Sequence, residues 1–308
     1  MSIPKGKGHT NMKNQKFGIE IEMTGITRQQ AANKLAQHWG TRPNSGSNDT
    51  VLDPQGRQWK LEYDGSIITR KKVGGALVGA DSEYSVELVS PVLTYEDIPL
   101  LQEAVRQFRH IGAVSSAELK CGIHIHINAE PHTPQSLRNI VNLITAKEDL
   151  VYKSLQIDPE RTRRYCQKVN GNLVEIINRQ KPRTMAKLAD IWYRANGAIS
   201  NRSWHYNRSR YHGLNLHSVF TKGTIEFRLF NGTLHAGKIR AYIVFCLAVS
   251  HQALRQKYAS PRKSQMDNEK YAFRCWLLRL GLIGDEFKNC REHLMAHLSG
   301  DSAWRHGA

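Results

Sequence analysis

This 308-residue sequence lacks several features that would assign it to a common class of protein. Its five cysteines are odd in number and include no CxxC pair, so neither a disulfide framework nor a zinc knuckle is predicted. The phosphate-binding patterns GxGxxG and GxxxxGKS are both missing, and the glycines within residues 71–81 are typical of a hairpin loop. There is no internal repeat and no low-complexity segment.

The chain also lacks a long apolar segment. Residues 1–16 are polar and lysine-rich, without the apolar centre of a signal peptide, and are expected to form a flexible tail. The most apolar later run, residues 239–250, is too short to cross a bilayer. Together with the unpaired cysteines, these absences predict a cytoplasmic protein with no membrane partner.

Acidic residues are scarce relative to basic ones. The sequence has 44 Lys and Arg against 27 Asp and Glu, which gives a formal net charge of +17. Such an excess favours an anionic partner: a nucleotide, an acidic peptide or a nucleic acid. Basic side chains are dense at residues 161–187, and arginines alternate with aromatics in a loop at residues 201–210. A metal-dependent nuclease or a basic nucleic-acid-binding protein is therefore one hypothesis.

What the sequence does contain is a set of short alternating segments. In residues 224–230, the apolar side chains share one face of a predicted strand, while Glu226 and Arg228 share the other. On its own, this acid–base pair is more typical of an ion pair on an exposed surface. The same alternation predicts further strands at residues 17–23, 57–64, 84–90, 121–128 and 211–217.

Helical patterns separate these strands. Thr27 is a candidate cap for a helix that runs to about Trp39, and Thr94 is a candidate cap for a helix that ends at Gly112. A longer helical insertion is predicted at residues 133–205, and a helical C-terminus at residues 236–300. Residues 17–308 are expected to form a single domain.

The polar faces of the predicted strands have an unusual composition. A solvated sheet face normally carries Thr, Ser, Lys and Gln, whereas these faces carry mainly carboxylates and imidazoles, which are metal ligands. So many carboxylates repel one another unless cations neutralise them, and divalent metal is the economical explanation. Residues two apart in a strand lie about 6.6 Å apart, far enough to serve adjacent ions. The set is Glu20, Glu22, Glu62, Asp64, Glu87, His124, His126, Asn215, His217, Glu226 and Arg228.

Taken in order, these motifs resemble those of the amidoligases, within the carboxylate–amine ligase superfamily of glutamine synthetase and glutamate–cysteine ligase. The similarity covers about residues 17–240. The matching stretches are residues 17–22 (FGIEIE), 59–66 (ending in DGS), 86–91 (VELVSP), 121–126 (CGIHIH) and 210–228 (ending in TIEFR).

The resemblance implies an α+β fold in which a curved, mainly antiparallel sheet forms a funnel-like active site for ATP and divalent metal. It also implies roles for individual residues. The metal ligands would be Glu20, Glu22, Glu87, His124 and Glu226. Arg228, Glu87 and Asp64 are assigned to catalysis, with Arg228 contacting the transferred phosphate. Arg228, His126, Arg210 and Asn215 are assigned to the nucleotide.

The activity implied by this resemblance is an ATP-dependent carboxylate–amine ligase. The γ-phosphoryl group of ATP would activate a substrate carboxylate as an acyl phosphate, and an amine would then displace phosphate to form an amide. Mg²⁺ is the expected metal because it accompanies ATP, with Mn²⁺ as the alternative. The acid and amine substrates stay open among amino acids, peptides and proteins.

Overall fold

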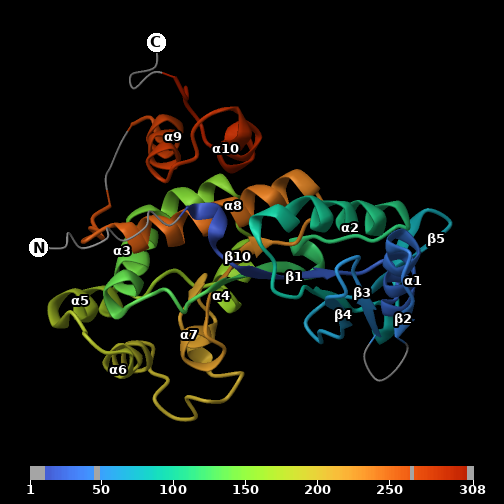
Figure 1. Cartoon of the computed structure of the whole chain (residues 1–308), viewed down its shortest axis with the longest axis horizontal. Coiled ribbons are helices and arrows are strands. Elements are labelled where there is room, and N and C mark those ends of the chain that lie inside the picture. The colour runs from blue at the N-terminus through green and yellow to red at the C-terminus, as the bar shows by residue number, and fades with distance from the viewer. Residues whose placement is uncertain (1–10, 45–48, 264–266, 304–308) are drawn as a thin grey trace, which may run out of the picture.

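The computed structural model describes residues 11–44, 49–263 and 267–303. At its centre is an eight-stranded sheet in the order β2-β3-β4-β7-β1-β8-β10-β9, in which all the described strand pairs are antiparallel (Figure 1). The sheet is open, with β2 and β9 at its edges, so it is not a closed barrel. The strands are β1 Phe17–Met23, β2 Pro43–Asn44, β3 Asp49–Leu52, β4 Gln58–Glu62, β7 Val86–Val89, β8 Gly122–Asn128, β9 Leu214–Asn215 and β10 Thr224–Asn231.

This mixed architecture confirms the prediction of helices combined with a mainly antiparallel sheet. A separate hairpin, β5 Arg70–Val73 and β6 Ala76–Gly79, occupies most of the predicted loop at residues 71–81. Gly74 and Gly75 form its turn, and both have positive φ angles, which explains why two glycines occur there. Two further strands, β2 and β3, lie within residues 40–56, although the Asn, Ser, Pro and Gly content of that segment is typical of a loop.

The first strand, β1, lies between β7 and β8 near the middle of the sheet. Its apolar positions Ile19 and Ile21 are buried on one face, opposite Ile123 and Ile125 of β8. Its glutamates project from the other face, as the period-two alternation requires. The central position of β1 therefore places two carboxylates in the interior of the sheet and not at an edge.

Helices α2 Ile98–His110, α3 Pro134–Ser154 and α8 Ala236–Arg255 lie over the apolar face of the central strands, and α1 Arg28–Trp39 packs against β3 and β4 (Figure 1). Helix α8 is buried on nearly all sides, because α9 Glu269–Arg279 and α10 Lys288–Met295 lie on its side away from the sheet. This burial accounts for the apolar run at residues 239–250. Within the described residues, no helix is long and apolar enough to cross a membrane.

The remaining helices begin at residues that the sequence marks. Helix α1 Arg28–Trp39 starts with a capping box from Thr27 and ends at Gly40 in the left-handed conformation. Thr133 caps α3 in the same way. The predicted insertion at residues 133–205 contains α3, α4 Pro159–Arg164, α5 Gly171–Gln180 and α6 Met185–Ala195. The short 3₁₀ turns are η1 Met12–Asn14, η2 Ser82–Tyr84, η3 Tyr95–Asp97, η4 Ala117–Leu119, η5 Arg208–Arg210 and η6 Asp285–Phe287.

The strand predicted at residues 211–217 is largely wrong. Only Leu214–Asn215 pairs in the sheet, and His217 begins the short helix α7 His217–Thr221. The Asn215 side-chain oxygen accepts a hydrogen bond from the His217 backbone N–H at 2.8 Å, and this local turn bends the chain out of the sheet. The His217 ring then hydrogen-bonds the Tyr193 hydroxyl at 2.7 Å, away from the polar face of the sheet.

The predicted N-terminal tail is partly packed. Residues 1–10 lie outside the described residues, but Met12 is buried in the core and η1 includes Lys13. Lys13 forms an ion pair with Glu286 at 2.7 Å, and Gln15 donates a hydrogen bond to the Leu247 carbonyl at 2.8 Å. Residues 11–16 are therefore held against the C-terminal helices.

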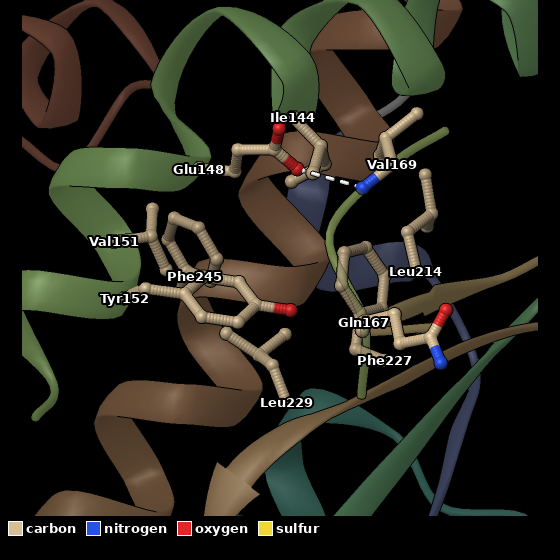
Figure 2. A pocket seen from close by; sticks show the side chains of 11 residues that line it. Ile144, Glu148, Val151, Tyr152, Gln167, Val169, Leu214, Phe227, Leu229 and Phe245 are labelled. Carbon is tan, nitrogen blue, oxygen red and sulfur yellow. Dashed lines mark hydrogen bonds between the residues drawn. The ribbon is translucent and has the colours of Figure 1, made fainter. Parts of the chain in front are cut away.

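The apolar side of β10 is densely packed. Figure 2 shows Phe227 and Leu229 pointing toward Tyr152 of α3 and Phe245 of α8, around a cavity of only about 10 Å³. A cavity of that size leaves Phe227 in contact with its neighbours on all sides, with no exposed surface.

Truncation of Phe227 should be strongly destabilising. Phe227→Ala is expected to lower the free energy of unfolding by about 3–5 kcal/mol, because it removes a buried ring and leaves a cavity on the apolar side of β10. Denaturant unfolding measures this change, with the half-exposed Leu52→Ala as the control that should cost much less. Equal losses in the two variants would contradict the described packing.

Candidate active site

Carboxylates from three neighbouring strands meet on the polar face of the sheet. Strand pairing aligns Glu22 of β1 with Glu87 of β7, and Glu87 with Glu62 of β4. On the other side of β1, Glu20 is aligned with His124 of β8. Alternation fixes the face on which each residue lies, and the strand order decides which residues become neighbours.

Glu20 lies at the centre of this arrangement and contacts two histidines. Its carboxylate lies 2.9 Å from His124 Nδ1 and 3.1 Å from His126 Nε2. Burial by itself would raise the pKa of Glu20, but the charge of His126 and the hydrogen bonds from both histidines outweigh burial and hold that pKa well below its usual range. Glu20 is therefore ionised and lies within ion-pair distance of two imidazoles.

The acid–base pair of β10, Glu226 and Arg228, is buried and not on an open surface. Both side chains are about 5% exposed or less, and the Arg228 guanidinium donates to Glu226 Oε1. Asn215 donates to the other carboxylate oxygen at 2.7 Å. Burial would raise the pKa of Glu226, but Arg228 outweighs it and brings the pKa to about 2. The surface-pair interpretation is therefore wrong.

The third part of the site is formed by Glu22, Asp64 and Glu87. The Gly122 backbone N–H donates to Glu22 Oε2 at 2.6 Å, and the Ser66 backbone N–H donates to Asp64 Oδ1 at 2.6 Å. Burial, followed by the charges of Glu20 and Glu22, raises the pKa of Glu87 well above its usual range. The fold thus holds carboxylates close enough to repel one another, and this repulsion favours the protonated form of Glu87.

These residues fit a divalent cation. Within the described residues, three groups of carboxylates and imidazoles each offer ligand atoms within 4.8 Å of one another. Oxygen donors predominate and imidazole is present in two of the groups, a set that suits Mg²⁺, Mn²⁺ or Zn²⁺. Neutralising the repulsion around Glu87 is what a bound cation would do. The groups are Glu20–Glu87–His124, Glu20–His126–Glu226 and Glu22–Asp64–Glu87.

The acidic face forms the floor of a cavity of about 550 Å³. Its walls come from loops and short helices outside the sheet and are basic and aromatic. Arg210, for example, stacks on the rings of Tyr206 and Tyr211, with its guanidinium 5.5 and 5.7 Å from their centroids. Further wall residues include Lys120, Arg161, Tyr165, His205 and Lys222. The acidic floor and the basic walls together suit an anionic ligand that binds with a metal ion.

Most of the residues singled out in the sequence line this cavity: Glu20, Glu22, Asp64, Glu87, His124, Arg210 and Arg228. Glu226 and His126 lie in contact with that set through Arg228 and Glu20. Asn215 holds Glu226, and His217 is turned away. Glu62 lines the cavity but belongs to none of the three ligand groups, and it pairs with Lys60 at 3.2 Å.

Sequence reasoning did not assign a role to several wall residues. Lys222 lies 4.0 Å from Glu20, and Tyr165 and His205 also line the cavity. Arg161 was visible only as one member of a basic run, and nothing in that run distinguishes it from its exposed neighbours Arg163 and Arg164. The arginine- and aromatic-rich loop was noticed, and its residues His205, Tyr206 and Arg210 line this cavity.

The fold and site together define a class: a protein with an antiparallel sheet whose acidic, imidazole-bearing face is enclosed as a polar cavity. Residues 13–250 match the family model Amidoligase_2, described as "putative amidoligase enzyme". The match covers most of the chain, so the chain belongs to the amidoligase family, a family of ligases, and the resemblance seen in its motifs is confirmed. A search of curated proteins returned no match.

Proposed function

We propose that this protein is an ATP-dependent carboxylate–amine ligase that forms an amide or peptide bond through an acyl-phosphate intermediate. The observation that carries the proposal is a cavity lined by Arg228 and by carboxylates and an imidazole from all three ligand groups, in a chain of the amidoligase family. The same observation favours the ligase over the nuclease hypothesis. The acidic sheet face with raised walls supports a funnel-like, glutamine synthetase-like active site.

Metal ions would be held by Glu20, Glu22, Glu87, His124 and Glu226, with His126 and Asp64 completing the three groups. Mg²⁺ is proposed as the working metal and Mn²⁺ as its substitute. When bound, such ions neutralise the phosphate oxygens of ATP and the charge that develops on them. His126, which the sequence assigned to the nucleotide, is proposed here as a metal ligand, because it lies between two candidate ligands, Glu20 and Glu226.

The reaction has two steps. A carboxylate oxygen of the acid substrate attacks the γ-phosphorus of ATP, the bond to the β-phosphate oxygen breaks, and ADP leaves. The amine nitrogen then attacks the acyl carbon, phosphate departs with its bridging oxygen, and the nitrogen loses a proton. Arg228 stabilises the charge on the transferred phosphoryl group. Glu87 and Asp64 both line the cavity and are proposed to accept the amine proton.

Arg210 is proposed to bind nucleotide phosphates, since it lines the cavity as a cation that forms no ion pair with a carboxylate within the described residues. Asn215 acts through Glu226 and not by touching the nucleotide. The acid and amine substrates are proposed to be amino acids, peptides or protein side chains. All five cysteines are unpaired, which supports the cytoplasm as the compartment.

A cross-screen of substrates tests the proposed function. Pools of carboxylic acids are combined with pools of amines in the presence of ATP and either Mg²⁺ or Mn²⁺, and phosphate release is measured before product masses are determined. We expect phosphate release above background only in wells that contain both an acid and an amine, with a product whose mass equals acid plus amine minus water. ATP turnover in no combination would contradict the proposal.

Asn215 provides a milder test of the metal assignment. Asn215→Ala removes the donor that orients Glu226 and should weaken Mn²⁺ binding by about 10–100-fold while the fold is retained. Calorimetric titration with MnCl₂ measures the affinity, and Asn172→Ala, at an exposed position in α5, is the matched control. An Mn²⁺ affinity equal to that of the control would show that Asn215 does not support a metal ligand.

A further inference from the structure

Arg161 of α4 is a buried arginine without a carboxylate partner. It is 4% exposed, and its Nε atom has no hydrogen-bond partner. Its guanidinium makes one described hydrogen bond, to the Arg228 carbonyl oxygen at 3.3 Å, and no ion pair joins it to a carboxylate anywhere in the described part of the chain. A buried charge in this state costs stability, so a ligand that pairs with it would recover that cost.

The guanidinium is also held in place by its surroundings. It lies so close over Gly122 that a β-carbon at that position would come within 2.2 Å of Arg161 Nη2. Gly122 in turn donates its N–H to Glu22, a member of the Glu22–Asp64–Glu87 group. Arg161 is therefore positioned on the wall of the cavity, next to one end of the row of candidate metal ligands.

Some of the positively charged side chains on this wall of the cavity have no carboxylate partner. Arg228, the other buried arginine of the cavity, is already engaged by Glu226, whereas Arg161 and the nearby cavity residue Lys120 have no carboxylate partner within the described residues. A planar guanidinium presents parallel N–H groups whose geometry matches the two oxygens of a carboxylate. An anion entering the cavity would meet an Arg161 guanidinium that makes only one hydrogen bond within the described residues, to the Arg228 carbonyl oxygen.

We propose that Arg161 is a substrate-binding residue that pairs with an anionic group of the acid substrate. The enzyme would then select acids that carry a carboxylate able to reach Arg161 in the cavity. The assignment of the anion to the acid substrate rests on the proposed ligase function. A phosphate group of the nucleotide offers similar oxygen chemistry, and the test below separates the two sources.

The test measures binding and not turnover. Thermal unfolding of the full chain is followed with increasing succinate, inorganic phosphate or ADP, each at an ionic strength matched with chloride. Succinate should raise the unfolding temperature of the wild-type protein. In Arg161→Gln this apparent affinity for succinate should be at least about tenfold weaker, because a charged hydrogen-bonded pair is lost. Without any anion, Arg161→Gln should unfold at the same temperature as wild type or higher.

Arg138→Gln is the matched control. Arg138 of α3 is also buried and also has an unpartnered Nε, but it does not line the cavity, so its replacement should leave the succinate effect unchanged. Gly122→Ala is a second variant that keeps the Arg161 charge and displaces its guanidinium. It should weaken the succinate effect as well, which keeps the proposal testable if Arg161→Gln does not fold.

A succinate effect of equal size in wild type, Arg161→Gln and Gly122→Ala would overturn the proposal. A loss confined to phosphate or ADP would overturn the assignment to the acid substrate. The assay needs neither ATP nor an amine, so its failure leaves the ligase proposal intact. A chain that binds succinate through Arg161 but forms no amide would contradict the proposed function alone.

Discussion

Replacing Glu20 with glutamine is expected to weaken divalent-metal binding by at least about 100-fold and to remove the stabilisation that metal gives to the fold. Glu20 belongs to two of the three candidate ligand groups, and its carboxylate contacts both His124 and His126. Glutamine has nearly the same shape but is a weaker donor without charge. One substitution therefore disables both groups while it preserves the packing of β1.

Calorimetric titration with MnCl₂, combined with thermal unfolding with and without metal, measures both effects. Glu62→Gln is the matched control, because Glu62 lies on the same polar face and lines the same cavity but belongs to none of the ligand groups. It should bind Mn²⁺ nearly as the wild type does. Equal affinities for Glu20→Gln and wild type would place the metal somewhere else.

Replacing Arg228 with lysine should lower the rate of amide formation by about 10²–10³-fold, the usual cost of losing one donor to a developing oxyanion. Lysine keeps a positive charge beside Glu226 but lacks the fork that reaches the carboxylate and the cavity together. Arg228→Gln would instead leave the buried Glu226 without its arginine partner, which is expected to cost about 3–5 kcal/mol of stability.

Single-turnover phosphate release measures the Arg228→Lys effect, and ADP binding measured by calorimetry separates it from a loss of nucleotide affinity. The exposed Arg179, which pairs with Glu175 on the surface of α5, supplies a control in Arg179→Lys. Its rate should match that of wild type. A rate in Arg228→Lys equal to that of the control would remove Arg228 from the catalytic group.

Much of the site was predictable from the sequence because alternation in a strand fixes which side chains share a face. Glu20, Glu22, Glu87, His124 and Glu226 were recognised in this way. The first four line one cavity, and Glu226 lies behind it in contact with Arg228. Alternation says nothing about strand order, however. The contact between Glu22 and Glu87, and that between Glu20 and His126, depend on β1 lying between β7 and β8.

The failures have local causes. His217 was predicted on a strand, but the side chain of Asn215 captures its backbone N–H and turns the chain into α7. Arg161 was hidden because its burial depends on Gly122, which is far away in sequence and lacks the side chain that would exclude the guanidinium. Met12 was assigned to a tail because burial against the C-terminal helices leaves no periodic pattern in a segment so short.

The most direct test of the proposed reaction follows an oxygen atom. The acid of an accepted substrate pair is labelled with ¹⁸O in its carboxylate, and the products are analysed by mass spectrometry after one turnover. Activation as an acyl phosphate predicts that one labelled oxygen moves from the acid to the released phosphate for each amide formed, and that ADP carries none. Amide formation with unlabelled phosphate would contradict the account.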